Sequence, residues 1–215
     1  MRPVICLITP SRPAGAGATR ELVDRIGAAA RAGVHLVQIR QPEWEGRALA
    51  ALAEQGVAAV RGTRARVLVN DRLDVALASG AHGVHLRGDS MPASRVRVAA
   101  PPNFLVGRSV HAAEEAAAVA RDGGVDYLIF GTIFATASKP GVATAGTPGL
   151  AAVCAAVPVP VLAVGGITPE RLGAVAGAGA AGFAAIGLFA EGGLDGLQTI
   201  VERAVHAFDT PAGVP

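Results

Sequence analysis

The sequence predicts an α/β fold of the (β/α)8 TIM-barrel class, built as a single domain, on the strength of three observations. First, short uncharged runs rich in valine, the pattern of strands buried on both faces, alternate eight times with helical stretches. Second, repeated βα units imply a parallel sheet, and eight of them favour a closed barrel over an open sheet. Third, the chain has 215 residues, 51% of them hydrophobic, which suits one large domain, and no linker interrupts the alternation.

The individual elements follow from local patterns taken in chain order. Glu21 and Asp24 place acidic residues in the first turns of the first helix, and Gly80 ends the third helix. The expected strands are Val4–Thr9, Val34–Arg40, Arg66–Asn70, His82–Leu86, Phe104–Ser109, Val125–Phe130, Val159–Val164 and Ala181–Ile186. The expected helices are Thr19–Ala32, Glu43–Arg61, Leu73–Ser79, Ala93–Ala99, Ala112–Arg121, Leu150–Ala156, one that opens at Thr168, and Gly196–Phe208. We assign residues 1–209 to the barrel and expect 210–215 to be a disordered tail.

The stretch Pro158–Gly187 contains two consecutive βα units, and both of its strands end in glycine. Gly165 and Gly166 end the first strand, and Thr168 opens the next helix as its N-cap, followed by a first-turn proline and an acidic residue. Gly187 ends the second strand. Glycines at two adjacent parallel strands expose backbone N–H groups side by side, and phosphate commonly binds after strands 7 and 8 of such barrels. We therefore expect a phosphate site here; the alternative is that the glycines only make tight turns.

Polar side chains occupy the other positions where a strand ends and a loop begins, which is where TIM barrels carry their chemistry. Such groups point into a barrel mouth only when something pairs with them, because burying them unpaired is costly. Gln38 and Arg40 are two apart on one strand and share a face, although Arg40 has the alternative of pairing with Asp71 across the mouth. The polar residues at these strand ends are Gln38, Arg40, Asn70, Asp71, His85, Ser109, His111, Thr132, Thr136, Ser138 and Lys139.

The five histidines differ in where they fall. His111 directly follows a strand end and is the best candidate for a general acid or base, since imidazole titrates near neutrality. His85 lies within a strand, and its position fits either a structural or a functional role. His35 and His82 begin strands, at the structural end of the barrel, where we expect their hydrogen bonds to be satisfied. We expect His206, on the last helix, to be exposed.

The long loop Thr132–Gly149 is rich in glycine, threonine and serine and contains Lys139. A loop of this kind is typical of a mobile lid that closes over a barrel mouth and excludes water. Of the 19 basic residues in the chain, Lys139 is the only lysine. It would supply a point positive charge to a phosphate. The alternative is a solvated loop lysine without a role.

Charge and composition argue against several classes of partner. The 19 basic and 17 acidic residues give a net charge of +2, so no broad basic surface is expected for nucleic acid. Leu150–Ile167 is uncharged, but prolines interrupt it, so we expect no membrane helix. Cys6 and Cys154 lack metal-like spacing, and no apolar run resembles a signal peptide, so we expect a reduced, cytoplasmic protein. The sequence leaves the oligomeric state open, a homo-oligomer included.

Several short motifs follow one another along nearly the whole chain in the order known from one family. They are Gln38-x-Arg40, Asn70-Asp71-Arg72, Gly83-Val-His-Leu86, Asp126-Tyr127 with Phe130-Gly131, Thr136-x-Ser-Lys139 and Pro160-Val-Leu-Ala-Val-Gly-Gly-Ile167. In these motifs the chain resembles thiamine phosphate synthase and its close relative, the thiazole tautomerase of thiamine biosynthesis. The resemblance implies a small (β/α)8 barrel that binds a thiazole phosphate.

Departures from the synthase pattern favour the tautomerase. The synthase joins a pyrimidine diphosphate to thiazole phosphate, and its pattern has a lysine where this chain has Pro42. It also has a second metal-binding aspartate where this chain has Ser90, although Asp89 lies one residue earlier. Gly107–His111, followed by Ala-Ala-Glu-Glu, closely resembles the tautomerase pattern, in which the histidine transfers the proton.

We therefore interpret the chain as a thiazole tautomerase-like isomerase that converts a carboxythiazole phosphate tautomer into the aromatic thiazole phosphate without a cofactor. The resemblance implies His111 as the catalytic residue and the glycines at 165, 166 and 187 as the phosphate site. The implied substrate contacts are Gln38, Arg40, Asn70, Ser109, Thr136 and Lys139. The first alternative is thiamine phosphate synthase, a transferase that would hold Mg²⁺ with Asp71 and Asp89. The second alternative is a non-catalytic barrel that binds a phosphorylated metabolite.

Overall fold

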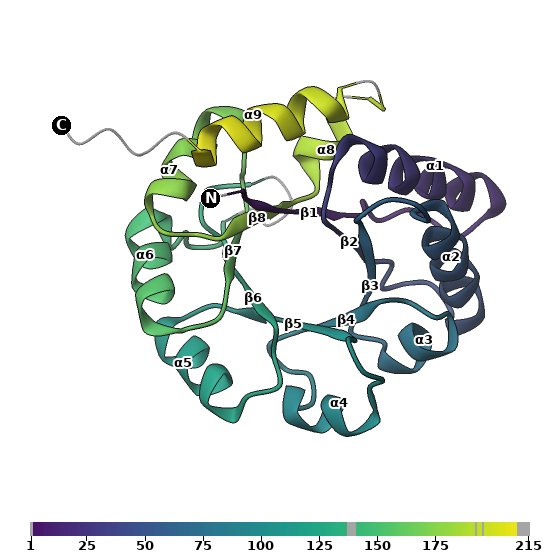
Figure 1. Cartoon of the computed structure of the whole chain (residues 1–215), viewed down its shortest axis with the longest axis horizontal. Helices are drawn as coiled ribbons and strands as arrows, with labels where there is room; N and C mark the ends of the chain where they lie inside the picture. Colours follow the sequence, from purple (N-terminus) through teal and green to yellow (C-terminus); the bar gives the residue numbers. More distant parts are fainter. Residues whose placement is uncertain (1, 137–140, 192, 195, 210–215) are drawn as a thin grey trace.

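The computed structural model describes residues 2–136, 141–191, 193–194 and 196–209, and it has the architecture that the sequence predicts. Eight parallel strands form a closed barrel in the order β1 to β8, with β1 paired to β8, and helices surround it (Figure 1). The strands are β1 Val4–Ile8, β2 Leu36–Ile39, β3 Arg66–Asn70, β4 Gly83–Leu86, β5 Leu105–Val110, β6 Tyr127–Phe130, β7 Val161–Val164 and β8 Gly182–Ala185. The predicted tail and Lys139 lie outside the described residues.

The helices alternate with these strands, as the repeated βα pattern predicts. They are α1 Ala16–Ala32, α2 Gly46–Ala59, α3 Leu73–Ala78, α4 Ala93–Ala99, α5 Ala113–Asp122, α6 Gly146–Ala156, the 3₁₀ turn η1 Pro169–Arg171, α7 Leu172–Gly177, α8 Gly187–Glu191 and α9 Leu197–Asp209. No helix in the described part of the chain is both long and apolar enough to span a membrane.

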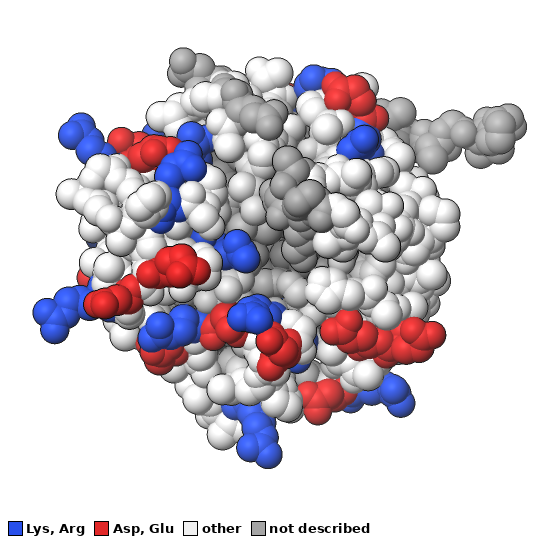
Figure 2. Space-filling model, turned by 180° about the vertical axis from the view of Figure 1, so that it is seen from behind, with Lys and Arg blue, Asp and Glu red and all other residues white. Residues whose placement is uncertain are grey.

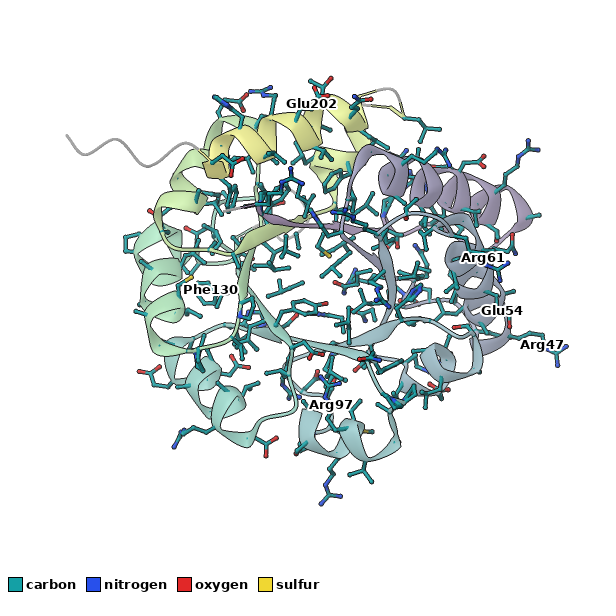
Figure 3. All side chains as sticks on the ribbon, in the orientation of Figure 1. Arg47, Glu54, Arg61, Arg97, Phe130 and Glu202 are labelled. Atoms are coloured by element: carbon teal, nitrogen blue, oxygen red, sulfur yellow. The ribbon has the colours of Figure 1, made fainter. Side chains whose placement is uncertain are left out.

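Alternation along each strand divides the hydrophobic core into two layers. Side chains that point outward from the barrel pack under the helices, and Phe130, for example, points from β6 toward α6 (Figure 3). Side chains that point inward fill the barrel with a second, smaller cluster. The inner cluster consists of Cys6, Ile8, Leu36, Leu68, Tyr127, Ile129, Leu162 and Ala184. Because this inner cluster fills the barrel, the space for a ligand lies at the carboxyl ends of the strands.

The amino-terminal end of the barrel is structural, as predicted. His35 accepts a hydrogen bond from the backbone N–H of Ile5 at 3.2 Å, and His82 accepts one from Val67 at 3.0 Å. Each imidazole therefore satisfies the backbone of a neighbouring strand at the start of the sheet. Burial and nearby arginines lower the pKa of both histidines, which keeps their rings neutral. His206 is exposed on α9.

Three local predictions need correction. Helix α6 begins at Gly146 rather than Leu150, because the loop before it is already held by backbone bonds, such as that from Ala145 N–H to the Thr132 carbonyl at 2.9 Å. Thr168 is the N-cap of η1 by position and backbone, but its side chain makes no capping hydrogen bond. The short helix α8 follows β8 directly, where the sequence predicts no helix.

Candidate active site

A large cavity opens at the carboxyl ends of the strands, with a volume of about 1060 Å³. Figure 2 shows one face of the molecule hollowed at its centre, with basic and acidic side chains gathered along part of the rim. The cavity wall contains every residue that the sequence predicts for catalysis, substrate or phosphate, except Lys139, which lies outside the described residues. These wall residues are Gln38, Arg40, Asn70, Ser109, His111, Thr136, Gly165, Gly166 and Gly187.

The floor of the cavity carries a buried amide pair from β2 and β3. The side-chain N–H of Gln38 donates to the Asn70 Oδ1 at 2.8 Å. Gln38 is only 3% exposed, and its Oε1 has no hydrogen-bond partner among the described residues. A buried acceptor left unpaired costs about 1–3 kcal/mol. This oxygen is therefore a site where a ligand N–H group would be bound favourably.

A second polar group on the floor is a hydrogen-bonded chain across β4, β5 and β6. His85 contacts the Tyr127 hydroxyl through Nδ1 at 3.1 Å and the Ser109 hydroxyl through Nε2 at 2.9 Å. Burial lowers the pKa of His85 to about 3, so its ring is neutral, with one nitrogen donating and the other accepting. Gly107 makes room for this chain, since a Cβ there would lie 2.2 Å from the Tyr127 ring.

His111 lies at the cavity wall just beyond the end of β5. Its Nδ1 is 2.7 Å from the carbonyl oxygen of Gly131, and its backbone N–H donates to the Glu115 carboxylate at 2.6 Å. A carbonyl only accepts, so Nδ1 carries a proton and donates this hydrogen bond. The predicted position of His111 is confirmed, whereas its chemical role stays a prediction.

The glycine end of the cavity is formed by the loops after β7 and β8. Gly165 and Gly166 have positive φ angles of 102° and 61°. A Cβ on Gly166 would lie 2.5 Å from the carbonyl oxygen of Ala135. Both this steric overlap and the positive φ disfavour a side chain at this position. The tight-turn alternative thus accounts for these two glycines by itself. Phosphate binding by their N–H groups, and by that of Gly187 at the start of α8, stays a prediction.

Helix α8 is fixed to the barrel from both sides. The Phe189 ring stacks on Phe183 of β8 with their centroids 6.2 Å apart. On the other side, the Arg25 guanidinium of α1 donates to the Phe189 carbonyl at 2.5 Å. Arg25 is 9% exposed, so a buried cation sits near the carboxyl end of this short helix, where it is electrostatically favourable. These contacts hold Gly187 in place at the cavity wall.

The carboxylates that the synthase alternative assigns to a metal lie at the ends of β3 and β4. Asp71 has a φ of 62°, unusual for a residue with a side chain. Its Oδ1 accepts a short hydrogen bond from the Ser90 hydroxyl, and its Oδ2 lies 4.0 Å from Arg87 Nη1. Asp89 pairs with the same guanidinium, at 2.8 Å from Nη2. Asp71 thus pairs with Arg87, and the alternative of an Arg40–Asp71 pair is wrong.

The predicted lid Thr132–Gly149 is bound to the barrel at both ends. The N–H groups of Ile133 and Phe134 donate to the carbonyls of Val164 and Gly165 at 3.0 and 3.1 Å. Gly146 N–H donates to the Ile133 carbonyl at 3.1 Å, which closes the loop at its base. Ser138 and Lys139 lie outside the described residues.

Comparison with known proteins decides the family. The family model described as thiamine monophosphate synthase matches residues 5–189. The chain belongs to this family. It is 40% identical to the thiamine-phosphate synthase of Roseiflexus castenholzii over 186 residues, which is 86% of this chain and 80% of that one. It is 36% identical to the thiamine-phosphate synthase of Chlorobium luteolum over 185 residues, which is 86% of this chain and 84% of the relative.

Solved structures agree with this family assignment. Thiamine phosphate pyrophosphorylase from Pyrococcus furiosus superposes with a TM-score of 0.78 at 29% identity and covers 94% of this chain and 96% of its own. A 3-hexulose-6-phosphate synthase superposes with a TM-score of 0.70 at 19% identity, covering 96% of this chain and 99% of its own, and shows the barrel fold alone.

The interpretation as a thiazole tautomerase is wrong. The relatives in this thiamine monophosphate synthase family at 36–40% identity are named thiamine-phosphate synthases, which agrees with the alternative instead. The interpretation gave too much weight to the Ser109-Val110-His111 turn and to the departures at Pro42 and Ser90. A histidine after β5 fits more than one reaction on this barrel, so its presence does not identify the chemistry.

The sequence gives little sign of several residues that shape this synthase-family site. Tyr127 lies at the start of β6, in the inner cluster, and reaches the floor only through His85. Arg87 and Arg108 are two of many arginines, and only the folded chain brings Arg108 to the loop that carries Asp89. Arg171 of η1 donates to the Gly166 carbonyl at 2.7 Å and supports the glycine end. For Tyr127, the family motif that includes it was the one available signal.

Proposed function

We propose that the chain is a thiamine-phosphate synthase, which joins a pyrimidine diphosphate to thiazole phosphate and releases diphosphate. The observation that carries this proposal is one cavity with two chemically different ends. Glycine backbone lines the end at β7 and β8, while Arg40, Arg87 and Asp89 line the end at β2 and β4. Two anionic substrates that must react with each other suit such a cavity, and the names of the relatives support the same reaction.

The floor supports recognition of a nitrogen-rich ring between the two ends. The unpaired Oε1 of Gln38 would accept a hydrogen bond from a ring amino group. Asn70 and Ser109 hold fixed positions beside it, each in a hydrogen bond to its neighbour on the next strand. The chain through His85 is neutral, so the floor repels neither a neutral ring nor one that gains positive charge as the diphosphate leaves.

The other end has the donor set that a substrate-bound Mg²⁺ requires. Mg²⁺ is usually held by one or two carboxylates together with substrate phosphates and water. The pair Asp71 and Asp89 already contacts one shared cation, the Arg87 guanidinium, so the two carboxylates converge on a common position. The described residues contain no group of three or more acidic, histidine or cysteine side chains able to hold a metal, which fits a metal that depends on substrate oxygens. When bound, the ion would neutralise charge on the departing diphosphate.

The residues at the remaining positions would bind and orient the two substrates. Arg40 is exposed in the cavity wall and forms no ion pair among the described residues, so its charge is available to a diphosphate. The N–H groups at Gly165, Gly166 and Gly187 would hold the thiazole phosphate, with Thr136 beside them in the wall. His111 would contact the substrate through Nε2. Lys139 keeps its predicted role as a further cation.

The test is product formation from defined substrates. The purified protein is incubated with the pyrimidine diphosphate and thiazole phosphate, once with Mg²⁺ and once with EDTA, and thiamine phosphate and free diphosphate are quantified. We expect the two products in equal amounts with Mg²⁺ and a loss of turnover with EDTA. Absence of thiamine phosphate in the Mg²⁺ arm would refute the proposal.

A further inference from the structure

Arg87 lies beside both carboxylates of the proposed metal site, at the rim of the cavity. Arg87 and Asp89 line the cavity, whereas Asp71, whose Oδ2 lies 4.0 Å from Arg87 Nη1, is not among the lining residues. The same guanidinium contacts Asp89 at 2.8 Å. One monovalent cation of the chain itself therefore lies next to both carboxylates.

The backbone around this guanidinium is fixed although the guanidinium itself is exposed. Arg108 is 8% exposed and donates to the carbonyls of Met91, Gly88 and Ser90 at 2.8, 2.6 and 3.0 Å. The Ser90 hydroxyl accepts the Arg87 backbone N–H at 2.9 Å and donates to Asp71. These hydrogen bonds fix the backbone of the loop that carries Asp89. The Arg87 side chain is 58% exposed and can leave its partners without moving this loop.

Charge balance favours such a move when an anion arrives. Two carboxylates with one guanidinium carry a net charge of −1, whereas two carboxylates with a divalent metal are neutral. In the second state the guanidinium is released, and its charge becomes available in the same cavity wall as Pro42 and Arg40. Pro42 brings no charge to this wall, so a released guanidinium would add to the single cation of Arg40.

We propose that Arg87 is a displaceable counter-ion: it occupies the metal position in the free protein and moves to the diphosphate when metal and diphosphate bind together. Arg87 then weakens binding of the metal alone and strengthens binding of the diphosphate, so the two ligands bind cooperatively. This inference rests on the proposed function for its substrate, but its test uses binding and not turnover.

The test compares the wild type with Arg87→Gln in two binding titrations. Mn²⁺ alone is titrated and followed by electron paramagnetic resonance of the free ion, and inorganic pyrophosphate is titrated by calorimetry at saturating Mn²⁺. We expect Arg87→Gln to bind Mn²⁺ at least about 10-fold more tightly, because a unit charge within about 4 Å of the ion is removed. The same variant should bind pyrophosphate about 10-fold more weakly, since it loses one charged contact.

Two matched variants separate this effect from net charge and from misfolding. Arg47→Gln removes the same charge from an exposed position on α2 that does not line the cavity, so both affinities should stay within about 2-fold. Arg87→Lys retains the charge and should stay close to the wild type in both titrations. A purely structural role of Arg87 would weaken both ligands together in Arg87→Gln.

Opposite changes in the two affinities of Arg87→Gln support the proposal, and any other pattern overturns it. Failure of the proposed function is seen separately, as the absence of thiamine phosphate from the wild-type protein with both substrates and Mg²⁺. If thiamine phosphate forms but Arg87→Gln does not change the Mn²⁺ and pyrophosphate affinities in opposite directions, the proposed function is supported and the proposed role of Arg87 is wrong.

Discussion

The two ends of the cavity, each of which we propose binds an anionic group, are built from different parts of the chain. At β7 and β8 the wall contains three glycines, Gly165, Gly166 and Gly187, which contribute backbone and no side chain of their own. At β2 to β4 the wall contains the charged side chains of Arg40, Arg87 and Asp89, and Arg87 pairs with Asp89 and with nearby Asp71. The first end is shaped once, when the barrel folds, whereas the second can rearrange its charges.

This difference determines how each end responds to change. Replacing a glycine by alanine at the β7–β8 end acts through steric overlap and backbone strain. Its effect is therefore independent of pH and of metal. Neutralising a group at the side-chain end acts through charge, and it depends on salt and on metal. The comparison therefore predicts that substitutions at the two ends affect different substrates.

The largest effect is expected from Asp71→Asn at the side-chain end. The change removes one of the two carboxylates proposed to hold Mg²⁺ while keeping the shape of the side chain. We expect kcat/KM for the pyrimidine diphosphate to fall about 10³-fold, because stabilisation of the departing charge is lost. Steady-state kinetics at several Mg²⁺ concentrations would measure it. Asp74→Asn, in the exposed pair with Arg72, is the matched control and should leave kcat/KM nearly unchanged. Equal activity of Asp71→Asn and wild type would remove Asp71 from the site.

The next largest effect is expected in the pH dependence of the free energy of unfolding. It depends on His85 in the cavity floor and not on the glycines at the β7–β8 end. Burial lowers the pKa of His85 from 6.5 to about 3. Between these two pH values, the histidine is protonated in the unfolded chain and neutral in the folded chain. Stability is therefore lost as pH falls through this range, by roughly 3 kcal/mol at pH 4.5. We expect His85→Gln to flatten the slope of unfolding free energy between pH 6.5 and 4.5 in urea titrations.

Two histidines at the opposite end of the barrel, His35 and His82, remain in that variant and contribute a residual slope of the same sign. An unchanged slope in His85→Gln would mean that His85 is not held neutral by burial.

A smaller effect is expected from Gly166→Ala at the backbone end. The residue has a φ of 61°, and a Cβ would lie 2.5 Å from the Ala135 carbonyl oxygen, so the loop must shift. With a cost of about 2 kcal/mol for the left-handed backbone, we expect KM for thiazole phosphate to rise about 30-fold. Gly173→Ala on α7, where a Cβ would meet nothing within 4 Å, is the control. A rise in KM for the pyrimidine diphosphate instead would contradict the division of the cavity.

The smallest effect is expected from Gln38→Leu in the floor. This change removes the unpaired Oε1 that we propose accepts a ring amino group, and it should raise KM for the pyrimidine diphosphate about 10-fold. The free energy of unfolding should fall by about 1–3 kcal/mol, because the variant also loses the N–H group that donates to the Asn70 Oδ1 and leaves this acceptor unpaired. Thermal unfolding together with steady-state kinetics measures both quantities. A large loss of stability with unchanged KM would make Gln38 a structural residue.

The barrel itself was predictable because buried parallel strands leave a strong local pattern. Runs such as Val161–Val164 are apolar on both faces, and eight of them leave few ways to close a sheet. Helix α8 was not predictable, since five residues carry too little periodicity to indicate a helix. It exists because Phe189 and Arg25 bind it to the barrel, and these contacts join distant parts of the chain.

The site was predictable in its positions more than in its chemistry. Strand ends meet at one mouth in any barrel, so Gln38, Asn70 and His111 were expected in one cavity and lie there. The sequence did not reveal which side chains pair. Asp71 pairs with Arg87 rather than Arg40, because its left-handed backbone and the loop clamped by Arg108 set the direction of both groups. The reaction was misassigned for a similar reason: one histidine after a strand fits several chemistries.

The most direct test of the two-ended cavity is a two-substrate kinetic analysis of Gly166→Ala and Gln38→Leu side by side. KM for thiazole phosphate and KM for the pyrimidine diphosphate are measured for the wild type and for each variant, with thiamine phosphate as the readout. We predict a crossed result, in which Gly166→Ala raises KM for thiazole phosphate alone and Gln38→Leu raises KM for the pyrimidine diphosphate alone. Wild-type protein that forms no thiamine phosphate, or variants that raise both KM values together, would contradict the account.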